Sequence, residues 1–243
     1  MFTTLPMTSR DLIGLVVSFV YASSLILVAE IIRRRRGYSQ EFTRKIVHVG
    51  AGMWVLGVLS LFENWYIGII PFASFIFINY IVWRYKLLDA IDAPDSTPGT
   101  VYFALSITIL FGLFWRTGSP GDQGYIAAAG TMAMTWGDAL AAIIGKVWGR
   151  HKYTVGKSTR SFEGSLAMFI ASGTAMFLVL MIGPGSSLSP HTAPLRLGVS
   201  LTAALIAALI ATGAEAVSPH GMDNISVPLI SGLTIFATVM ALG

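Results

Sequence analysis

The 243-residue chain has no cysteine and little charge, since Asp, Glu, Lys and Arg make up only 12% of it. Soluble domains carry about twice that share of charged residues. Without cysteine, the chain has no disulfide bond, thiolate metal ligand or cysteine nucleophile. Proline-rich, serine-rich and acidic low-complexity tracts are also missing, which excludes a disordered protein. Hydrophobic residues account for 54% of the chain, and the mean hydropathy is +0.71. The composition therefore predicts an integral membrane protein.

Eight apolar segments approach or exceed the length needed to cross a bilayer, which is about 20 helical residues. They occupy residues 12–32, 46–62, 66–83, 100–115, 125–147, 162–183, 197–214 and 225–242. None shows the short alternating pattern of a membrane β-barrel. The sequence therefore predicts an all-α, polytopic membrane protein, with residues 1–243 in a single integral domain. We expect about eight transmembrane helices, with seven as the alternative.

The net charge of +4 arises from an uneven distribution of lysine and arginine. Thirteen of the 16 basic residues lie in the connections 33–45, 84–99 and 146–161. The opposite side holds only Arg10, Arg116 and Arg196. The positive-inside rule places the basic side in the cytoplasm and both termini outside. We therefore expect a multi-pass protein of a bacterial inner membrane or an equivalent membrane, with no nucleic-acid partner. The sequence does not indicate an oligomeric state.

The densest group of polar residues begins at Asp138, inside an apolar segment. An ionised carboxylate at membrane depth is costly, so Asp138 is a functional-site candidate. The alternative is a packing residue bonded to a neighbouring Ser, Thr or Trp. Gly145 and Gly149 follow at helical spacing and permit close approach of a helix or a ligand. Tight packing is the simpler interpretation of these two glycines.

A basic connection follows, and it suits a polyphosphate because cations and backbone N–H groups can surround one. Its candidate phosphate contacts are Arg150, Lys152, Lys157, Ser158 and Arg160. Membrane anchoring explains any one of these cations, but not the surrounding pattern of Asp, Gly and Glu. Gly156-Lys157-Ser158 resembles the end of a P-loop, yet His151 stands where the first glycine is required. We expect no strand here and exclude a P-loop.

Ser161 and Glu163 open the sixth apolar segment. In a purely structural role, Ser161 caps the helix and Glu163 lies in its first turn, where the helix dipole favours a carboxylate. In a functional role, Glu163 is a metal ligand or catalytic carboxylate beside Asp138. Mg²⁺ suits that role because it takes one or two carboxylates together with substrate phosphates.

A second polar group, Arg44-Lys45 and His48, opens the second apolar segment. Arg44 and His48 are four residues apart and share a helical face. His48 could contact a phosphate or assist a proton transfer. The alternative is a histidine bonded to a backbone carbonyl.

A third polar group precedes the last apolar segment and contains Glu215, Asp223, Asn224 and Pro228. Either Asp223 or Asn224 is a candidate N-cap of the last helix. Alternatively, the group completes a metal or nucleotide site.

Together these motifs resemble the polyprenol kinase family, which includes dolichol, phytol and farnesol kinases. Four motifs carry the resemblance: R-K-x-x-H (44–48), G-D-A-x-A-x-x-x-G-x-x-x-G (137–149), R-S-x-E-G-S (160–165) and D-N-x-x-x-P (223–228). They span most of the chain, whose short length is closer to the phytol and farnesol kinases. Where Arg160 stands, the family often has lysine, so whether Arg160 or Lys157 contacts the phosphates is open.

The resemblance implies phosphorylation of an isoprenoid alcohol (phytol, geranylgeraniol or farnesol) by a nucleotide, typically CTP, with Mg²⁺. The roles carried over fall on Asp138, Lys157, Ser158, Arg160, Glu163 and Gly164. Our catalytic candidates are Asp138, Glu163 and His48, and the first two are also the metal candidates. Asp138 would hold the metal or take the alcohol proton, with His48 as the second candidate base. The nucleotide candidates are Arg44, Lys45, Gly145, Gly149, Arg150, Lys152, Lys157, Ser158, Arg160, Ser161, Gly164, Asp223 and Asn224.

Two other functions stay open at this point. A membrane cytidylyltransferase would use the same metal and basic connection to make a CDP-lipid, releasing pyrophosphate. A small transporter would instead line a pathway with intramembrane Asp138 and Glu215. Polar residues clustered towards one face disfavour the transporter.

Overall fold

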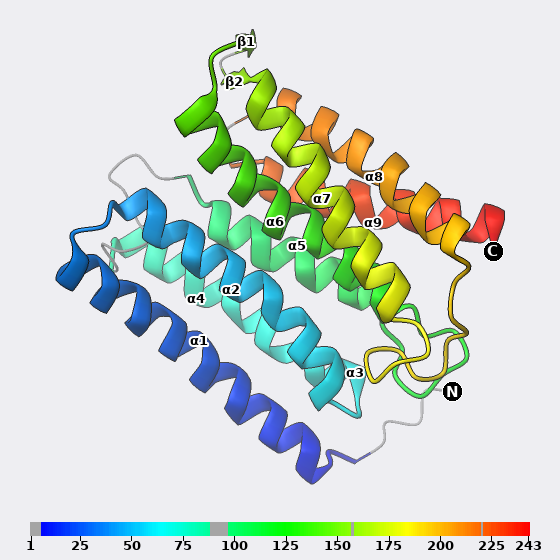
Figure 1. The fold of residues 1–243 in the computed structure, drawn as a ribbon. Helices are drawn as coiled ribbons and strands as arrows, with labels where there is room; N and C mark the ends of the chain where they lie inside the picture. The colour runs from blue at the N-terminus through cyan, green and yellow to red at the C-terminus, as the bar shows by residue number, and fades with distance from the viewer. Residues whose placement is uncertain (1–5, 88–96, 157, 220) are drawn as a thin grey trace.

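The computed structural model describes residues 6–87, 97–156, 158–219 and 221–243, and it is a bundle of helices (Figure 1). The helices are α1 (Ser9–Arg36), α2 (Gln40–Leu61), α3 (Trp65–Gly68), α4 (Ile70–Tyr85), α5 (Gly99–Phe114), α6 (Gly124–Trp148), α7 (Phe162–Ile182), α8 (Leu197–Val217) and α9 (Asp223–Leu242). Each predicted apolar segment forms a helix, with α3 and α4 sharing the third. The all-α membrane fold is therefore confirmed.

Seven helical stretches in the described residues are long and apolar enough to span a membrane, counting α3 and α4 together. The remaining apolar helix, α5, has only 16 residues. In Figure 1, α1 begins and α9 ends at the same end of the bundle. An even number of crossings gives that arrangement, so the geometry favours α5 as an eighth crossing.

The centre of the bundle is α6, which contacts α2, α5, α7 and α9. It is the most buried of the candidate spans, and its first half is rich in alanine and glycine. These small residues let neighbouring backbones come close. A Cβ atom at Gly130, for example, would lie 2.9 Å from the carbonyl oxygen of Pro228 on α9. Close packing on α6 therefore fixes the positions of the helices that carry the polar groups.

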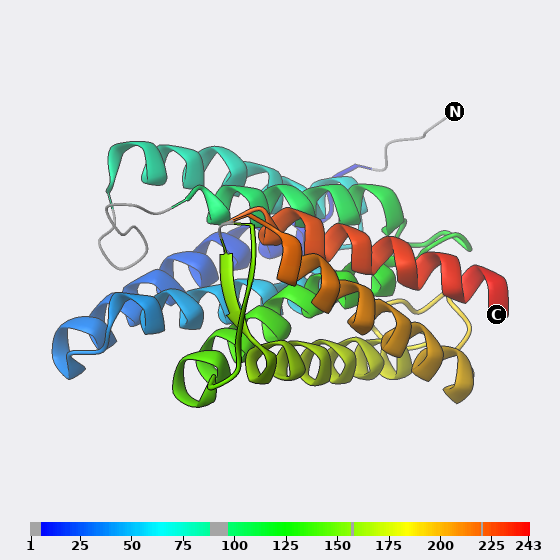
Figure 2. The ribbon, with the colours of Figure 1, turned by 90° about the horizontal axis from the view of Figure 1, so that it is seen from above.

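The connection between α6 and α7 contains a β-hairpin, so the expectation of no strand is wrong. Strands β1 (Lys152–Val155) and β2 (Ser158–Ser161) pair antiparallel, with Val155 opposite Ser158. Gly156 adopts φ +60, which suits the tight turn of a hairpin. Figure 2 shows the hairpin crossing one end of the bundle, which we call the hairpin end.

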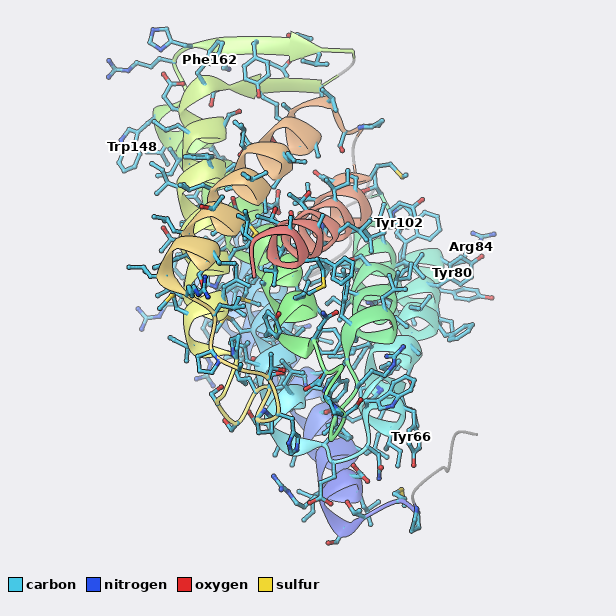
Figure 3. The ribbon with its side chains drawn as sticks, turned by 90° about the vertical axis from the view of Figure 1, so that its right-hand side faces the viewer. Tyr66, Tyr80, Arg84, Tyr102, Trp148 and Phe162 are labelled. Atoms are coloured by element: carbon cyan, nitrogen blue, oxygen red, sulfur yellow. The ribbon has the colours of Figure 1, made fainter. Side chains whose placement is uncertain are left out.

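The hairpin end lies opposite the start of α1 and the end of α9 (Figure 1). The last turn of α1, which contains four arginines, also lies at the hairpin end. These arginines continue the helix, whereas the sequence pattern predicts a connection there. Exposed Trp148 and Phe162 also lie there, whereas Tyr66 lies towards the other end (Figure 3). Aromatic and basic residues at helix ends are typical of a membrane interface. Which end faces the cytoplasm stays a prediction.

Candidate functional site

Asp138 on α6 lies against two cationic or ionisable side chains of α2. Its carboxylate forms an ion pair with Lys45, and Oδ2 lies 3.9 Å from His48 Nε2. All three side chains are largely buried, between 12% and 17% exposed. Gly52 allows this approach, because a Cβ atom there would lie 2.0 Å from Thr135 Oγ1 on α6. The predicted R-K-x-x-H and G-D motifs therefore meet in the structure.

His48 also lies against the backbone of α6. Its Nε2 atom is 3.2 Å from the carbonyl oxygen of Met134. The alternative of a histidine bonded to a backbone carbonyl is therefore observed, together with its proximity to Asp138. Arg44, one turn earlier on α2, is exposed at the helix surface.

Arg160 at the end of β2 points into the bundle and joins two further carboxylates. Its Nε atom lies 2.6 Å from Glu215 Oε1 on α8, and Nη2 lies 3.8 Å from Asp223 Oδ2 on α9. Nε makes no hydrogen bond within the part of the chain that the structure describes, so the contact with Glu215 is an ion pair. Glu215 and Asp223 are 7% and 11% exposed at their side chains. The hairpin is thus anchored to α8 and α9 by charge.

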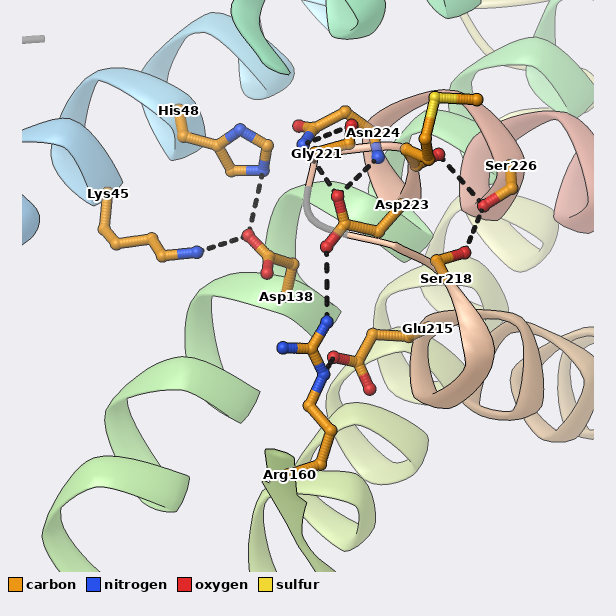
Figure 4. Close-up of polar contacts among 11 residues, drawn as sticks. Lys45, His48, Asp138, Arg160, Glu215, Ser218, Gly221, Asp223, Asn224 and Ser226 are labelled. Atoms are coloured by element: carbon orange, nitrogen blue, oxygen red, sulfur yellow. Dashed lines mark hydrogen bonds and ion pairs between the residues drawn. The ribbon is translucent and has the colours of Figure 1, made fainter. Parts of the chain in front are cut away.

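These two sets of contacts form one site at the hairpin end. We call it the charge cluster: Lys45, His48, Asp138, Arg160, Glu215 and Asp223. Figure 4 shows Asp138 and Asp223 pointing into the same space from α6 and α9. Among the described residues, the three carboxylates of the cluster face two permanent cations, so the cluster favours an additional cation. Burial strengthens that preference, because charges interact more strongly away from water.

The donor chemistry of the cluster fits Mg²⁺ bound together with a phosphate. Among the residues that the structure describes, no three Asp, Glu or His side chains converge closely enough to hold a metal by themselves. Mg²⁺ does not need such a cage, because it takes one or two carboxylates and completes its shell with phosphates and water. Asp138 and Asp223 supply suitable oxygen atoms.

Asn224 supports Asp223 instead of capping α9. Asp223 Oδ1 accepts hydrogen bonds from the backbone N and from Nδ2 of Asn224, each at 2.9 Å. The helix begins at Asp223, its N-cap position is Met222, and no side chain caps it. The expectation that Asp223 or Asn224 caps the helix is therefore wrong. Asp223 instead turns towards Arg160.

Glu163 lies in a different environment from Asp138. Ser161 is the N-cap of α7, as predicted, and its Oγ accepts from the N–H of Gly164 at 3.1 Å. Glu163 in the first turn has its Oε1 atom 2.6 Å from His151 Nδ1. The two predicted metal carboxylates thus have separate partners, and their pairing stays a prediction.

The predicted glycine residues lie where α6 and α7 pack together. A Cβ atom at Gly164 would lie 3.1 Å from the carbonyl oxygen of Ala141 and 3.3 Å from Gly145 Cα. At Gly149 it would lie 2.6 Å from Ser161 Oγ. Tight packing, the simpler interpretation, is therefore observed, and a nucleotide contact stays a prediction.

The remaining predicted phosphate contacts lie on or beside the hairpin. Arg150 and Lys152 are exposed there, whereas Ser158 is buried. Lys157 lies outside the described residues. The neighbouring Lys146 forms an ion pair with Glu41 of α2.

Sequence reasoning placed Glu215 in the third polar group and in the pathway of the alternative transporter, and it gave no role to His151. Glu215 directly follows the apolar segment 197–214, whereas Asp138 lies inside one, so its signal is weaker. Nothing in the local sequence distinguishes His151 from the other polar residues of its connection. Its partner Glu163 is 12 residues away, across the hairpin.

Comparison with known proteins shows similarity to phytol kinases. The chain is 34% identical to a phytol kinase from Synechocystis sp., over 96% of this chain and 94% of that protein. It is 28% identical to probable phytol kinase 2 of Oryza sativa subsp. japonica, over 93% of this chain and 75% of that protein. It is 29% identical to probable phytol kinase 2 of Glycine max, over 88% and 71%. Both plant proteins are described as chloroplastic. No family model and no solved structure matches the chain. The comparison confirms the predicted resemblance to the short members of the polyprenol kinase family. The chain belongs to the phytol kinase family.

Proposed function

We propose that the protein transfers the γ-phosphoryl group of CTP to the hydroxyl of phytol, or of the related geranylgeraniol or farnesol, at the cytoplasmic membrane face. Membership of the phytol kinase family makes the chain a phosphotransferase with an alcohol acceptor. The observation that carries the site assignment is the charge cluster. It brings residues of α2, α6, β2, α8 and α9 together at the hairpin end.

Phosphoryl transfer needs positioning and charge neutralisation more than covalent help from the protein. Arg160 suits the phosphates, because its planar guanidinium can bind two oxygen atoms at once. Lys45 supplies a second cation from α2. Exposed Arg150 and Lys152 add positive charge on the water side of the hairpin. Asp138 and Asp223 would hold Mg²⁺, which neutralises phosphate charge when bound.

The reaction joins the alcohol oxygen to the γ-phosphorus and breaks the bond between that phosphorus and the bridging oxygen of CDP. The hydroxyl proton goes to a base of the cluster. Asp138 and His48 are the candidate bases, and His48 would take the proton when Asp138 holds the metal. A membrane-embedded site suits this reaction because the acceptor dissolves in the bilayer.

A product assay tests the proposal. The purified protein is given Mg²⁺, γ-labelled CTP and a panel of isoprenoid alcohols. We expect label in a prenyl monophosphate and release of CDP, with ATP, GTP and UTP as weaker donors. Pyrophosphate release with a lipid phosphate would identify a cytidylyltransferase instead. Substrate flux without nucleotide consumption would identify a transporter.

A further inference from the structure

An apolar groove of about 930 Å³ runs along α7, between α7, α6 and α2. Its size lies within the usual range of small-molecule sites, about 300–1,000 Å³. We call it the α7 groove. Among the residues that line it, Glu163 is the only charged one, and Thr174 is the only other residue outside the hydrophobic class.

The α7 groove has one polar end and one apolar end. Glu163 and Trp148 lie at the hairpin end, whereas Ile182 and Leu188 lie at the other. From Glu163 to Ile182 the helix advances about 28 Å, at roughly 1.5 Å per residue. Glu163 is three residues from Arg160, so the polar end of the groove and the charge cluster share the junction of β2 and α7.

We propose that the α7 groove holds the isoprenoid chain of the acceptor alcohol, with the hydroxyl leaving the groove past Glu163 towards the charge cluster, an inference that rests on the proposed function. The charge of Glu163 favours the alcohol over a bilayer phospholipid as the occupant of the groove. The carboxylate of Glu163 can accept a hydrogen bond from a neutral hydroxyl, whereas it repels an anionic headgroup.

Three alanines on α7 line the groove at increasing distances from Glu163. Ala167, Ala171 and Ala175 line it at steps of four residues, and all three are half-buried. Exposed Leu166, Ile170 and Leu178 also line the groove on α7. Each step of four residues advances about 6 Å along the helix. The three alanines therefore lie about 6, 12 and 18 Å beyond Glu163, by the same helical rise.

These positions match the lengths of isoprenoid chains. From standard bond lengths and angles, extended phytol, farnesol and geraniol chains span about 20, 15 and 10 Å. Phytol therefore reaches past all three alanines, farnesol passes Ala167 and Ala171, and geraniol passes Ala167 only. The small alanines thus leave the groove open to all three chains, and a larger side chain at each position would close it at a different depth.

The test replaces each alanine with phenylalanine and measures kcat/KM for the three alcohols. We expect Ala175→Phe to lower kcat/KM at least about tenfold for phytol and to spare farnesol and geraniol, since hydrophobic pockets discriminate by about 10- to 200-fold per small group. Ala171→Phe should lower it for phytol and farnesol, and Ala167→Phe for all three. Ala237→Phe is the matched control, because Ala237 is exposed on α9 outside the groove.

The possible results distinguish a wrong assignment of the groove from a wrong proposed function. Geraniol phosphorylation by Ala175→Phe and Ala171→Phe shows that these variants fold. Equal losses for all three alcohols in Ala175→Phe, or wild-type preference in all three variants, would overturn the groove assignment and leave the kinase activity standing. A wild-type protein that phosphorylates no alcohol would overturn the proposed function itself.

Discussion

Arg160 shows how single residues hold the site together. One side chain from the hairpin compensates two carboxylates that come from different helices and lie about 55 and 63 residues further along the chain. Removing one partner of a buried ion pair leaves an uncompensated charge, which costs far more than a surface pair contributes. Arg160 is therefore important for stability as well as for the proposed phosphate binding.

We predict that Arg160→Met lowers the free energy of unfolding by about 3 kcal/mol, because Glu215 and Asp223 stay buried without a cation. The double variant Arg160→Met/Glu215→Gln should recover part of this loss, since it removes one of the two carboxylates. Thermal unfolding in detergent measures both. Arg196→Met is the control, because Arg196 is exposed at the opposite end of the bundle. A single variant as stable as this control would contradict the role of Arg160.

At the scale of elements, α6 positions the site because other helices pack closely against it. Asp138 and Asp223 face the same space only if α9 lies against α6. Gly130 permits that contact, since a Cβ atom there would meet the backbone of Pro228 at 2.9 Å and of Gly232 at 3.0 Å. Both obstacles are backbone atoms, so no side chain can rotate away.

We predict that Gly130→Ala destabilises the protein by about 1–3 kcal/mol, the usual cost of overpacking. Gly213→Ala is the matched control on α8, because a Cβ atom there meets nothing within 4 Å. Alanine in an exposed helix interior is favoured over glycine by roughly 0.5–1 kcal/mol, so this control should be as stable as the wild type or more so. Thermal unfolding of the two variants gives the comparison, and equal effects would contradict close packing at Gly130.

The helices could be predicted from the sequence, but the hairpin and the ion pairs could not. Long apolar runs mark the helices directly, and Ser161 marked the start of α7. The strands of the hairpin have four residues each and lie among basic residues that membrane anchoring explains equally well. Lys45 and Asp138 are 93 residues apart, and their contact depends on how α2 packs against α6. One sequence shows which groups carry charge, but not which of them meet.

Across the whole bundle, the two ends differ in charge. The arginines that end α1, the hairpin and the charge cluster lie at the hairpin end, while α1 begins and α9 ends opposite. The positive-inside rule predicts that the hairpin end faces the cytoplasm, where nucleotides are available.

Cysteine labelling tests this orientation, since the natural chain contains no cysteine. Thr154→Cys places an exposed thiol on the hairpin, and His191→Cys places one in the exposed connection before α8. In intact bacterial cells, a membrane-impermeant maleimide should label His191→Cys and leave Thr154→Cys unmodified. Lysis should expose both. Labelling of Thr154→Cys in intact cells would contradict the predicted orientation.

The turnover of Asp138→Asn tests whether phosphoryl transfer takes place at the charge cluster. Asparagine keeps the size and shape of the side chain but removes its charge. Loss of one charge-stabilising group costs about 10²–10³ in kcat, so we predict that drop at temperatures where the variant is folded. The thermal midpoint should also fall, because Lys45 loses its carboxylate partner. Glu30→Gln is the control, because Glu30 pairs with Arg33 and Arg34 near the same end and lies outside the cluster. A folded Asp138→Asn protein that phosphorylates phytol at the wild-type rate would contradict the account.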